Sequence, residues 1–307
     1  MTKKIFTQLL MASGCVMGFL QSHAQTDADA IMMYKNNLCS GLVYEHSAWD
    51  HYWEGTHKRD NANLGTVRTQ MASVMAIYGI TGRLNVMANL PYIKNQASAG
   101  QLHGMKGLQD LSLWVKWLPL QKEVGNGTFS LFAIGGFMLP ASNYTPDFLP
   151  LSIGMHSKTA ALRGLVDYQF GDWFATASAT YNRHSNITLD RHTYYTTEMH
   201  YSREVKMPNA TQYQVRAGRR STHVIAEAIV TNYNTLGGFD ITKNNMPFPS
   251  NEMDMTTAGV NLKYEFGKWL KGVSLIGGGS QTVCGRNVGQ STAFYGGIFY
   301  VVNFNKK

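Results

Sequence analysis

The sequence has few cysteines, few charged residues and, after its first 24 residues, no long apolar run. Three cysteines in 307 residues are too few for a scaffold held together by disulfides. Beyond the N-terminus, no apolar run approaches the roughly 20 residues that a membrane helix needs. Glycine-rich phosphate loops, paired catalytic cysteines and nucleotide fingerprints are also missing. Nothing in the sequence therefore predicts a cofactor, and an enzyme is not expected.

The N-terminus has the three parts of a secretory signal peptide. Lys3 and Lys4 come first, an apolar stretch extends from Ile5 to Leu20, and Ser22-His23-Ala24 offers a cleavage site. We expect residues 1–24 to be removed. Cleavage lowers the formal net charge from +8 to +6, because those residues contain two lysines and no acid. Residues 25–37 form a short polar tail, long enough for a small insert in a lumen but not for a plug domain.

The rest of the chain, residues 38–307, alternates between apolar and polar side chains. Leu84, Val86 and Ala88 are apolar while Asn85 and Asn89 beside them are polar, the period of two of a strand with unlike faces. A soluble sandwich gives a similar alternation. An exported chain that crosses a membrane without helices must do so as a closed barrel. Many glycines and aromatic residues, with only 15% charged residues, favour the barrel.

The spacing predicts an antiparallel transmembrane β-barrel of about twelve strands. The expected strands are residues 38–52, 64–78, 82–93, 108–118, 127–139, 158–170, 173–184, 209–218, 222–234, 256–266, 271–281 and 292–304. Short connections are expected at 79–81, 171–172, 219–221 and 267–270, with a somewhat longer one at 119–126, and they alternate strictly with long polar ones. This rhythm is typical of outer-membrane barrels, with short turns in the periplasm and longer loops outside. It predicts that both termini are periplasmic.

Charged residues within the expected strands fall on the face opposite the apolar one. On the lipid face each would cost roughly 2–4 kcal/mol near the midplane, so we place them in the lumen. In the second strand the assignment is open, because Val67, Met71 and Met75 compete with Val74 for the apolar face. The candidate lumen and selectivity residues are Arg83, Lys116, Arg163, Asp167, Arg216, Glu227, Lys263 and Glu265. Cross-strand ion-pair ladders are the alternative role for the same side chains, and the five cations favour anionic or polar aromatic solutes.

Four other patterns also have simple explanations. The basic residues are dispersed, so the positive charge predicts contact with anionic lipid or solute and not with nucleic acid. The histidines fit no compact ligand motif, and no metal site is predicted. His184 and Ser185 resemble part of a lipase site but are adjacent, so they point to opposite faces of a strand. The glycines at 277–279 indicate barrel curvature or, as the alternative, a kink that opens the wall sideways.

Two motifs resemble a known family. Tyr78–Leu84 with Leu90-Pro91-Tyr92, followed by Gly107–Leu113, is similar to the outer-membrane family named for the MetA pathway of phenol degradation. Gly82 departs from the acidic residue or asparagine usual there. The resemblance covers roughly 40 residues and implies a barrel that passes small, often hydrophobic, compounds. The last strand, ending in Phe304, also resembles the signal for the barrel-assembly machinery, although three residues follow it.

These observations predict a single-domain protein of the bacterial outer membrane that passes small, hydrophobic or aromatic, solutes by passive diffusion. Outer-membrane lipid and lipopolysaccharide, the barrel-assembly machinery and the solute are the expected partners. The alternative is a barrel without transport function that serves as an envelope scaffold or binds through its long loops. A lipid hydrolase is the third and weakest hypothesis.

Overall fold

The structure, a computed structural model, describes residue 26 and residues 28–242, 245–267 and 270–304. The predicted signal peptide lies outside these residues. Twelve long strands are β1 (Asn37–Trp49), β4 (Val67–Thr81), β5 (Leu84–Ala97), β7 (Asp110–Val124), β8 (Gly127–Pro140), β9 (Thr159–Phe170), β10 (Trp173–His184), β15 (Ala210–Arg220), β16 (Val224–Thr235), β17 (Asp254–Glu265), β18 (Val273–Arg286) and β19 (Thr292–Asn303). Short strands in the connections are β2 (His51–Glu54), β3 (His57–Asp60), β6 (Lys106–Leu108), β11 (Ile187–Thr188), β12 (Tyr194–Tyr195), β13 (Met199–His200) and β14 (Glu204–Val205).

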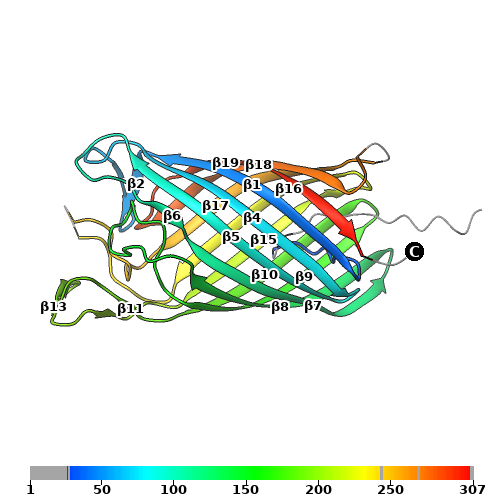
Figure 1. The fold of residues 1–307 in the computed structure, drawn as a ribbon, viewed down its shortest axis with the longest axis horizontal. Coiled ribbons are helices and arrows are strands. Elements are labelled where there is room, and N and C mark those ends of the chain that lie inside the picture. Colours follow the sequence, from blue (N-terminus) through cyan, green and yellow to red (C-terminus); the bar gives the residue numbers. More distant parts are fainter. Residues whose placement is uncertain (1–25, 27, 243–244, 268–269, 305–307) are drawn as a thin grey trace, which may run out of the picture.

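The sheet closes on itself because β1 pairs with β4 on one side and with β19 on the other. Every other long strand pairs antiparallel with the long strands before and after it in the chain. No edge is left along this cycle, and Figure 1 shows the resulting barrel from the side. The predicted antiparallel barrel of about twelve strands is confirmed.

The two ends of the barrel differ in their connections. At one end, which we call the turn end, β7 joins β8 through Gly125 and Asn126, and β9 joins β10 through Gly171 and Asp172. At the other, the loop end, the connections include residues 50–66, 141–158, 185–209 and 236–253. Strands β2, β6, β11 and β13 lie at this end, on the left of Figure 1. β1 begins and β19 ends at the turn end, so both ends of the wall lie on the same side.

Turns at the turn end lie a few residues from their expected positions. β4 continues through Gly79 to Thr81, and its turn to β5 consists of Gly82 and Arg83. A register shift between Gly79 and Thr81 allows this extension. The longer turn expected at 119–126 is in fact two residues, because β7 extends to Val124. The β7–β8 register shifts between residues 117 and 120, and this irregularity accommodates Pro119, which has no N–H for the ladder.

The exterior of the wall is apolar. In β9 the exposed Leu162 and Val166 alternate with Arg163 and Asp167, which are buried inside. Leu162 is 67% exposed. An apolar side chain that is exposed to this degree suits contact with lipid chains and not with water. Among the described residues, no helix is long and apolar enough to cross a bilayer. Other exposed apolar side chains on the wall include Val215, Val230, Val260, Leu262, Leu275 and Ile298.

The ambiguous second strand, β4, faces the interior with Val67 and the exterior with Val74. Val67 is 1% exposed and Val74 is 54% exposed. Parity then directs Met75 and Ile77 inward as well. The interior therefore receives large apolar side chains from β4, which explains why alternation alone gave no answer there.

The wall is continuous at the glycines of β18. Gly277, Gly278 and Gly279 each pair with a residue of β17 on one side and of β19 on the other. Gly278 also has no room for a side chain, because a Cβ there would lie 2.3 Å from the Val260 carbonyl oxygen. These glycines therefore serve close packing, and the alternative of a sideways opening is wrong for this position.

Candidate functional site: the barrel interior

A cavity of about 220 Å³ lies inside the barrel and combines polar and apolar walls. Its lining comes from two sources, inward-facing side chains of the barrel wall and the chain that precedes β1. The lining residues are Thr26, Asp29, Ile31, Val43, Glu45, Met75, Arg216, Arg220, Ile225, Glu227, Asn261, Lys263, Ile276, Tyr295 and Phe299.

The cations that line the cavity, Arg216, Arg220 and Lys263, are each paired with a carboxylate. The Arg216 Nε donates to Glu227 Oε2 over 3.1 Å, and its Nη2 contacts the other carboxylate oxygen. The Lys263 ammonium pairs with Glu265 two residues along the same strand. All four side chains are buried. Because charges in low dielectric need partners, these pairs allow the wall to carry ionised groups at membrane depth.

A third pair joins Asp167 of β9 to Arg220 of β15. The Arg220 Nη1 lies 3.3 Å from Asp167 Oδ2, and the Thr176 hydroxyl donates to Asp167 Oδ1 over 2.5 Å. The Arg220 guanidinium also lies over the Phe174 ring, 4.1 Å from its centroid. Sequence reasoning missed Arg220, because it is the last residue of its strand and was assigned to a turn.

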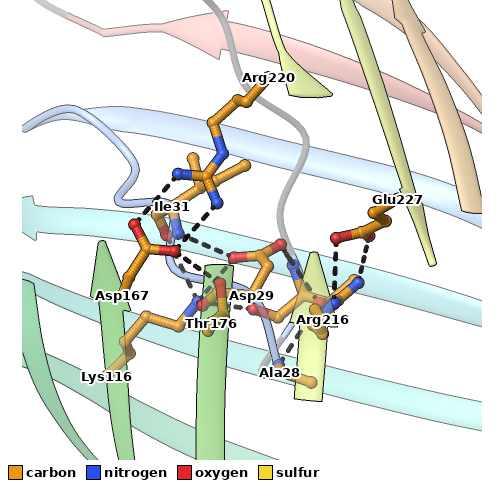
Figure 2. A network of polar contacts seen from close by, with 10 residues as sticks. Ala28, Asp29, Ile31, Lys116, Asp167, Thr176, Arg216, Arg220 and Glu227 are labelled. Carbon is orange, nitrogen blue, oxygen red and sulfur yellow. Dashed lines mark hydrogen bonds and ion pairs between the residues drawn. The ribbon is translucent and has the colours of Figure 1, made fainter. Parts of the chain in front are cut away.

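The chain before β1 enters the barrel and binds Lys116. This N-terminal segment, residue 26 with residues 28–36, presents four oxygen atoms to the Lys116 ammonium (Figure 2). The Lys116 Nζ lies 2.6 Å from the Thr26 carbonyl oxygen, 2.9 Å from that of Asp29, 3.0 Å from Asp29 Oδ1 and 3.3 Å from the Ile31 carbonyl oxygen. The Lys116 side chain is fully buried. An ammonium has three protons, so four oxygens satisfy it completely.

Asp29 also fixes the shape of the N-terminal segment. Its carboxylate accepts hydrogen bonds from the backbone N–H of Thr26, over 2.6 Å, and of Ile31, over 3.1 Å. Such carboxylate-to-backbone bonds stabilise a tight turn. The same turn directs three carbonyl oxygens at Lys116, so the segment is shaped for this lysine.

Apolar contacts hold the N-terminal segment against both sides of the wall. Met33 is 1% exposed and packs with Ile77 and Phe299 of β4 and β19, while Met32 packs against a cluster on β7, β8 and β9. At Gly79 the segment lies so close that a Cβ would stand 2.1 Å from the Tyr34 carbonyl oxygen. The segment therefore crosses the interior at the turn end. Of the two options left by the sequence, a tail or a small insert, the structure has the insert.

The loop end is also partly covered. Leu151, in the connection between β8 and β9, is fully buried against Leu64 and the inward-facing Val67. The Asn95 side-chain amide donates to the Ser152 carbonyl oxygen over 2.6 Å and holds this connection against β5. Residues 141–158 therefore cover the interior beside β4 and β5.

A polar cluster links the remaining loops to one another. The Arg286 guanidinium forms a bidentate pair with Asp240, at 2.8 Å for both bonds, and contacts Glu252 at 2.9 Å. The Asn287 side-chain carbonyl accepts from the backbone N–H of Gly55. Hydrogen bonding to Arg286 lowers the pKa of Asp240 despite some desolvation. Asp240 therefore stays ionised at neutral pH, and the cluster connects three loops.

The structure brings seven of the eight candidate lumen residues to the interior. Arg163 is buried, donates to the Thr180 hydroxyl over 2.7 Å and lies over the Trp114 ring. Arg83 differs, because it lies in the exposed turn between β4 and β5 and is not a wall residue. Its expected position is wrong, because β4 is longer than predicted. The inward residues other than Arg83 are Lys116, Arg163, Asp167, Arg216, Glu227, Lys263 and Glu265.

The pairing changes the expected electrostatics of the lumen. Lys116 is satisfied by the N-terminal segment, Arg216 by Glu227 and Lys263 by Glu265. An anionic solute was expected because the lumen was predicted to have an excess of positive charge. These carboxylate partners largely cancel that excess.

The lipase-like pair of His184 and Ser185 and the histidines form no recognisable catalytic or metal site among the described residues. Ser185 lies just beyond β10, where its hydroxyl accepts from the Lys158 N–H over 3.0 Å. In the described part of the chain, no three histidine, cysteine, aspartate or glutamate side chains are grouped to hold a metal ion. The two free cysteines lie far apart, with Cys39 near the turn end and Cys284 near the loop end.

Comparison with known proteins supports the fold. No family model and no curated protein matches the chain. The chain is similar to the crystal structure of the COG4313 outer membrane channel from Pseudomonas putida F1, with a TM-score of 0.72 and 14% identity, over 91% of this chain and 100% of that chain. Lower TM-scores relate it to the translocator domain of the autotransporter NalP from Neisseria meningitidis (0.45; 12% identity; 97% and 95% of the two chains) and to the β domain of the Bordetella autotransporter BrkA (0.44; 15%; 85% and 98%). By its closed twelve-stranded wall and its apolar exterior, the chain is an outer-membrane β-barrel.

Proposed function

We propose that this protein is an outer-membrane channel that passes small solutes by passive diffusion. The observation that carries the proposal is the cavity of about 220 Å³ between paired charges inside a closed wall. Small barrels fill their interior with side chains, whereas wide porins leave an aqueous pore. A twelve-stranded wall with a partly filled interior lies between these cases and suits a narrow, selective path.

The proposed orientation places the turn end in the periplasm and the loop end outside, as in other outer-membrane barrels. Both termini are then periplasmic, consistent with export by the predicted signal peptide. Lipopolysaccharide and phospholipid surround the wall, and the C-terminal strand with Phe304 is the proposed signal for the barrel-assembly machinery.

The N-terminal segment is the proposed closing element of the channel. It crosses the turn end and is bound through Lys116 and Met33. A solute can then pass only if this segment shifts, or it must take the narrow path that the segment leaves beside it. A variant lacking residues 25–35 is expected to conduct more current than the full mature chain.

The solute class follows from the cavity and from the family resemblance. Val43, Met75 and Ile276 form an apolar side, and the charged pairs form a polar one. Such a wall suits a small solute with both apolar and polar parts, in agreement with the small, often hydrophobic, compounds that the MetA-type resemblance implies and with the aromatic solutes expected from the sequence. The proposed role is transport, without catalysis.

A non-transporting scaffold is the second candidate function. It is favoured by the coverage of both ends, by the N-terminal segment at one and by Leu151 with its loop at the other. Planar-bilayer recording of the mature chain and of the variant lacking residues 25–35 separates the two functions. The channel predicts current that rises in the truncated variant. A scaffold predicts no current from the mature chain and unchanged solute uptake in a deletion strain.

A liposome-swelling assay then tests the solute class. Sugars, amino acids and aromatic acids of similar size are compared in vesicles that contain the purified protein. Swelling with every solute alike would contradict a selective path. A lipid-hydrolysis assay with His184→Ala as control tests the remaining enzymatic hypothesis.

A further inference from the structure

Glu45 is a carboxylate that lines the interior cavity without a cationic partner. Of the cations lining the same cavity, Arg216 is paired with Glu227, Arg220 with Asp167 and Lys263 with Glu265. Within the described part of the chain, Glu45 makes neither a hydrogen bond nor an ion pair. The cavity therefore contains one carboxylate that is not paired with any described residue.

One aromatic ring lies beside this carboxylate, and a second lines the same cavity farther along the strand. Glu45 of β1 is directly opposite Tyr295 of β19 in the register of the two strands, and both line the cavity. The Tyr295 hydroxyl donates to the Asn261 side-chain carbonyl over 2.9 Å, which holds the phenol ring in place. Phe299, four residues farther along β19, is 1% exposed and packs over Gly41, where a Cβ would lie 2.3 Å from the ring. The rings are thus fixed before any solute enters.

Apolar side chains also line the cavity. Val43 lies two residues from Glu45 on the same strand, and Met75 and Ile276 line the cavity from β4 and β18. A carboxylate beside one aromatic ring, with apolar side chains and a second ring farther along a small space, are groups that recognise an organic cation. The carboxylate pairs with the charge, the Tyr295 ring attracts it through its quadrupole, and the apolar groups, with Phe299, cover the apolar part.

We propose that the interior cavity binds a small organic ammonium ion, with its charge at Glu45 and its apolar part against Val43, Met75, Ile276 and Phe299. This inference rests on the proposed channel function and names the solute class of the same site. An anion is disfavoured there, because it would meet an uncompensated carboxylate in a partly desolvated space. A neutral solute gains the apolar contacts but leaves the carboxylate without a partner.

Ligand binding to the purified mature chain in detergent tests the proposal. The probes are benzylammonium, benzoate and benzyl alcohol, which share a ring and differ in charge, and affinity is measured by calorimetry at pH 7. Benzylammonium is expected to bind more tightly than the other two. Glu45→Gln removes the charge at nearly constant volume and is expected to weaken the binding of benzylammonium by at least about tenfold. Glu45→Asp keeps the charge and is expected to retain most of the affinity.

A matched control is Glu198→Gln, which removes an exposed carboxylate from the loop end. It is expected to leave benzylammonium binding unchanged. Folding of each variant is verified by its electrophoretic mobility before and after heating. Equal binding of benzoate, an unchanged affinity in Glu45→Gln, or failure of every probe to bind would each overturn the proposal.

The binding assay does not depend on current, so the two proposals fail separately. Planar-bilayer current without ammonium binding would keep the channel and remove the cation site. Ammonium binding that is sensitive to Glu45→Gln, without current in any variant, would keep the cation site and remove the channel.

Discussion

Replacement of Lys116 by methionine is expected to release the N-terminal segment. Methionine keeps most of the length of lysine but cannot donate to the Thr26, Asp29 and Ile31 oxygens that now lie within 3.3 Å of the ammonium. The Asp29 carboxylate, 13% exposed, then stays buried without its cation. Removal of one partner from a buried ion pair costs about 3–5 kcal/mol.

The segment avoids that cost by leaving the interior. The free energy that holds it inside the barrel therefore falls by up to the same amount, about 3–5 kcal/mol. A change of this size shifts an equilibrium by about two to three and a half orders of magnitude. The apolar anchor at Met33 remains and contributes about 1.5–3 kcal/mol. Detachment is therefore expected to become frequent while the barrel itself stays folded.

Two measurements follow this change. In a Cys284→Ser background, the native Cys39, which is buried in one cluster with Met33, reports departure of the segment through its rate of maleimide labelling, and planar bilayers report conductance. Lys116→Met is expected to raise both. Lys122→Met, an exposed lysine of the same strand, is the control and should change neither. Equal labelling and conductance in Lys116→Met and its parent would refute the role assigned to this lysine.

Three further changes test other parts of the structure. Arg216→Met leaves the Glu227 carboxylate buried without its cationic partner, with the Asn261 amide still donating to it, and should lower stability by about 3–5 kcal/mol. The loss is seen as a lower temperature for the heat-induced shift in electrophoretic mobility, and a second change, Glu227→Gln, should restore most of the stability. The lowered pKa of Asp240 means that its pairing with Arg286 is complete above the unfolded value of 3.8 and is lost as the pH falls through the lower folded value. Pepsin should therefore cut residues 236–253 faster as the pH falls, and Asp240→Asn should abolish that dependence, whereas equal dependence in the variant would contradict the assignment. Leu162→Arg should cost about 2–4 kcal/mol of folding free energy in lipid vesicles, and no loss would mean that this side chain does not face lipid.

Strand parity made most of the wall predictable from sequence. A charge such as Arg163 or Asp167 between Leu162 and Val166 has one acceptable side, because lipid excludes it. The rhythm of short and long connections gave the strand number and the common side of both wall ends. Failures arose where parity carried no information. In β4 both faces are apolar, and only the position of Val67 inside the closed wall resolved them.

Turn positions were less predictable, because irregular pairing shifts them without changing the strand pattern. The extension of β4 through Gly79 moved Arg83 out of the wall and into a turn. Arg220 was missed for the related reason that a strand end and a turn look alike in sequence. Its partner Asp167 lies on β9, which is two strands away around the barrel.

The sequence by itself determined which residues face lipid and which face inward, because alternation against a hydrocarbon solvent is a local property of each strand. Only the tertiary structure decided which inward groups meet. The partners of Lys116 are contributed by a segment roughly 90 residues earlier in the chain, and Glu45 and Tyr295 become neighbours only when the last strand returns to the first. Such contacts depend on closure of the barrel, a condition that no single stretch of sequence contains.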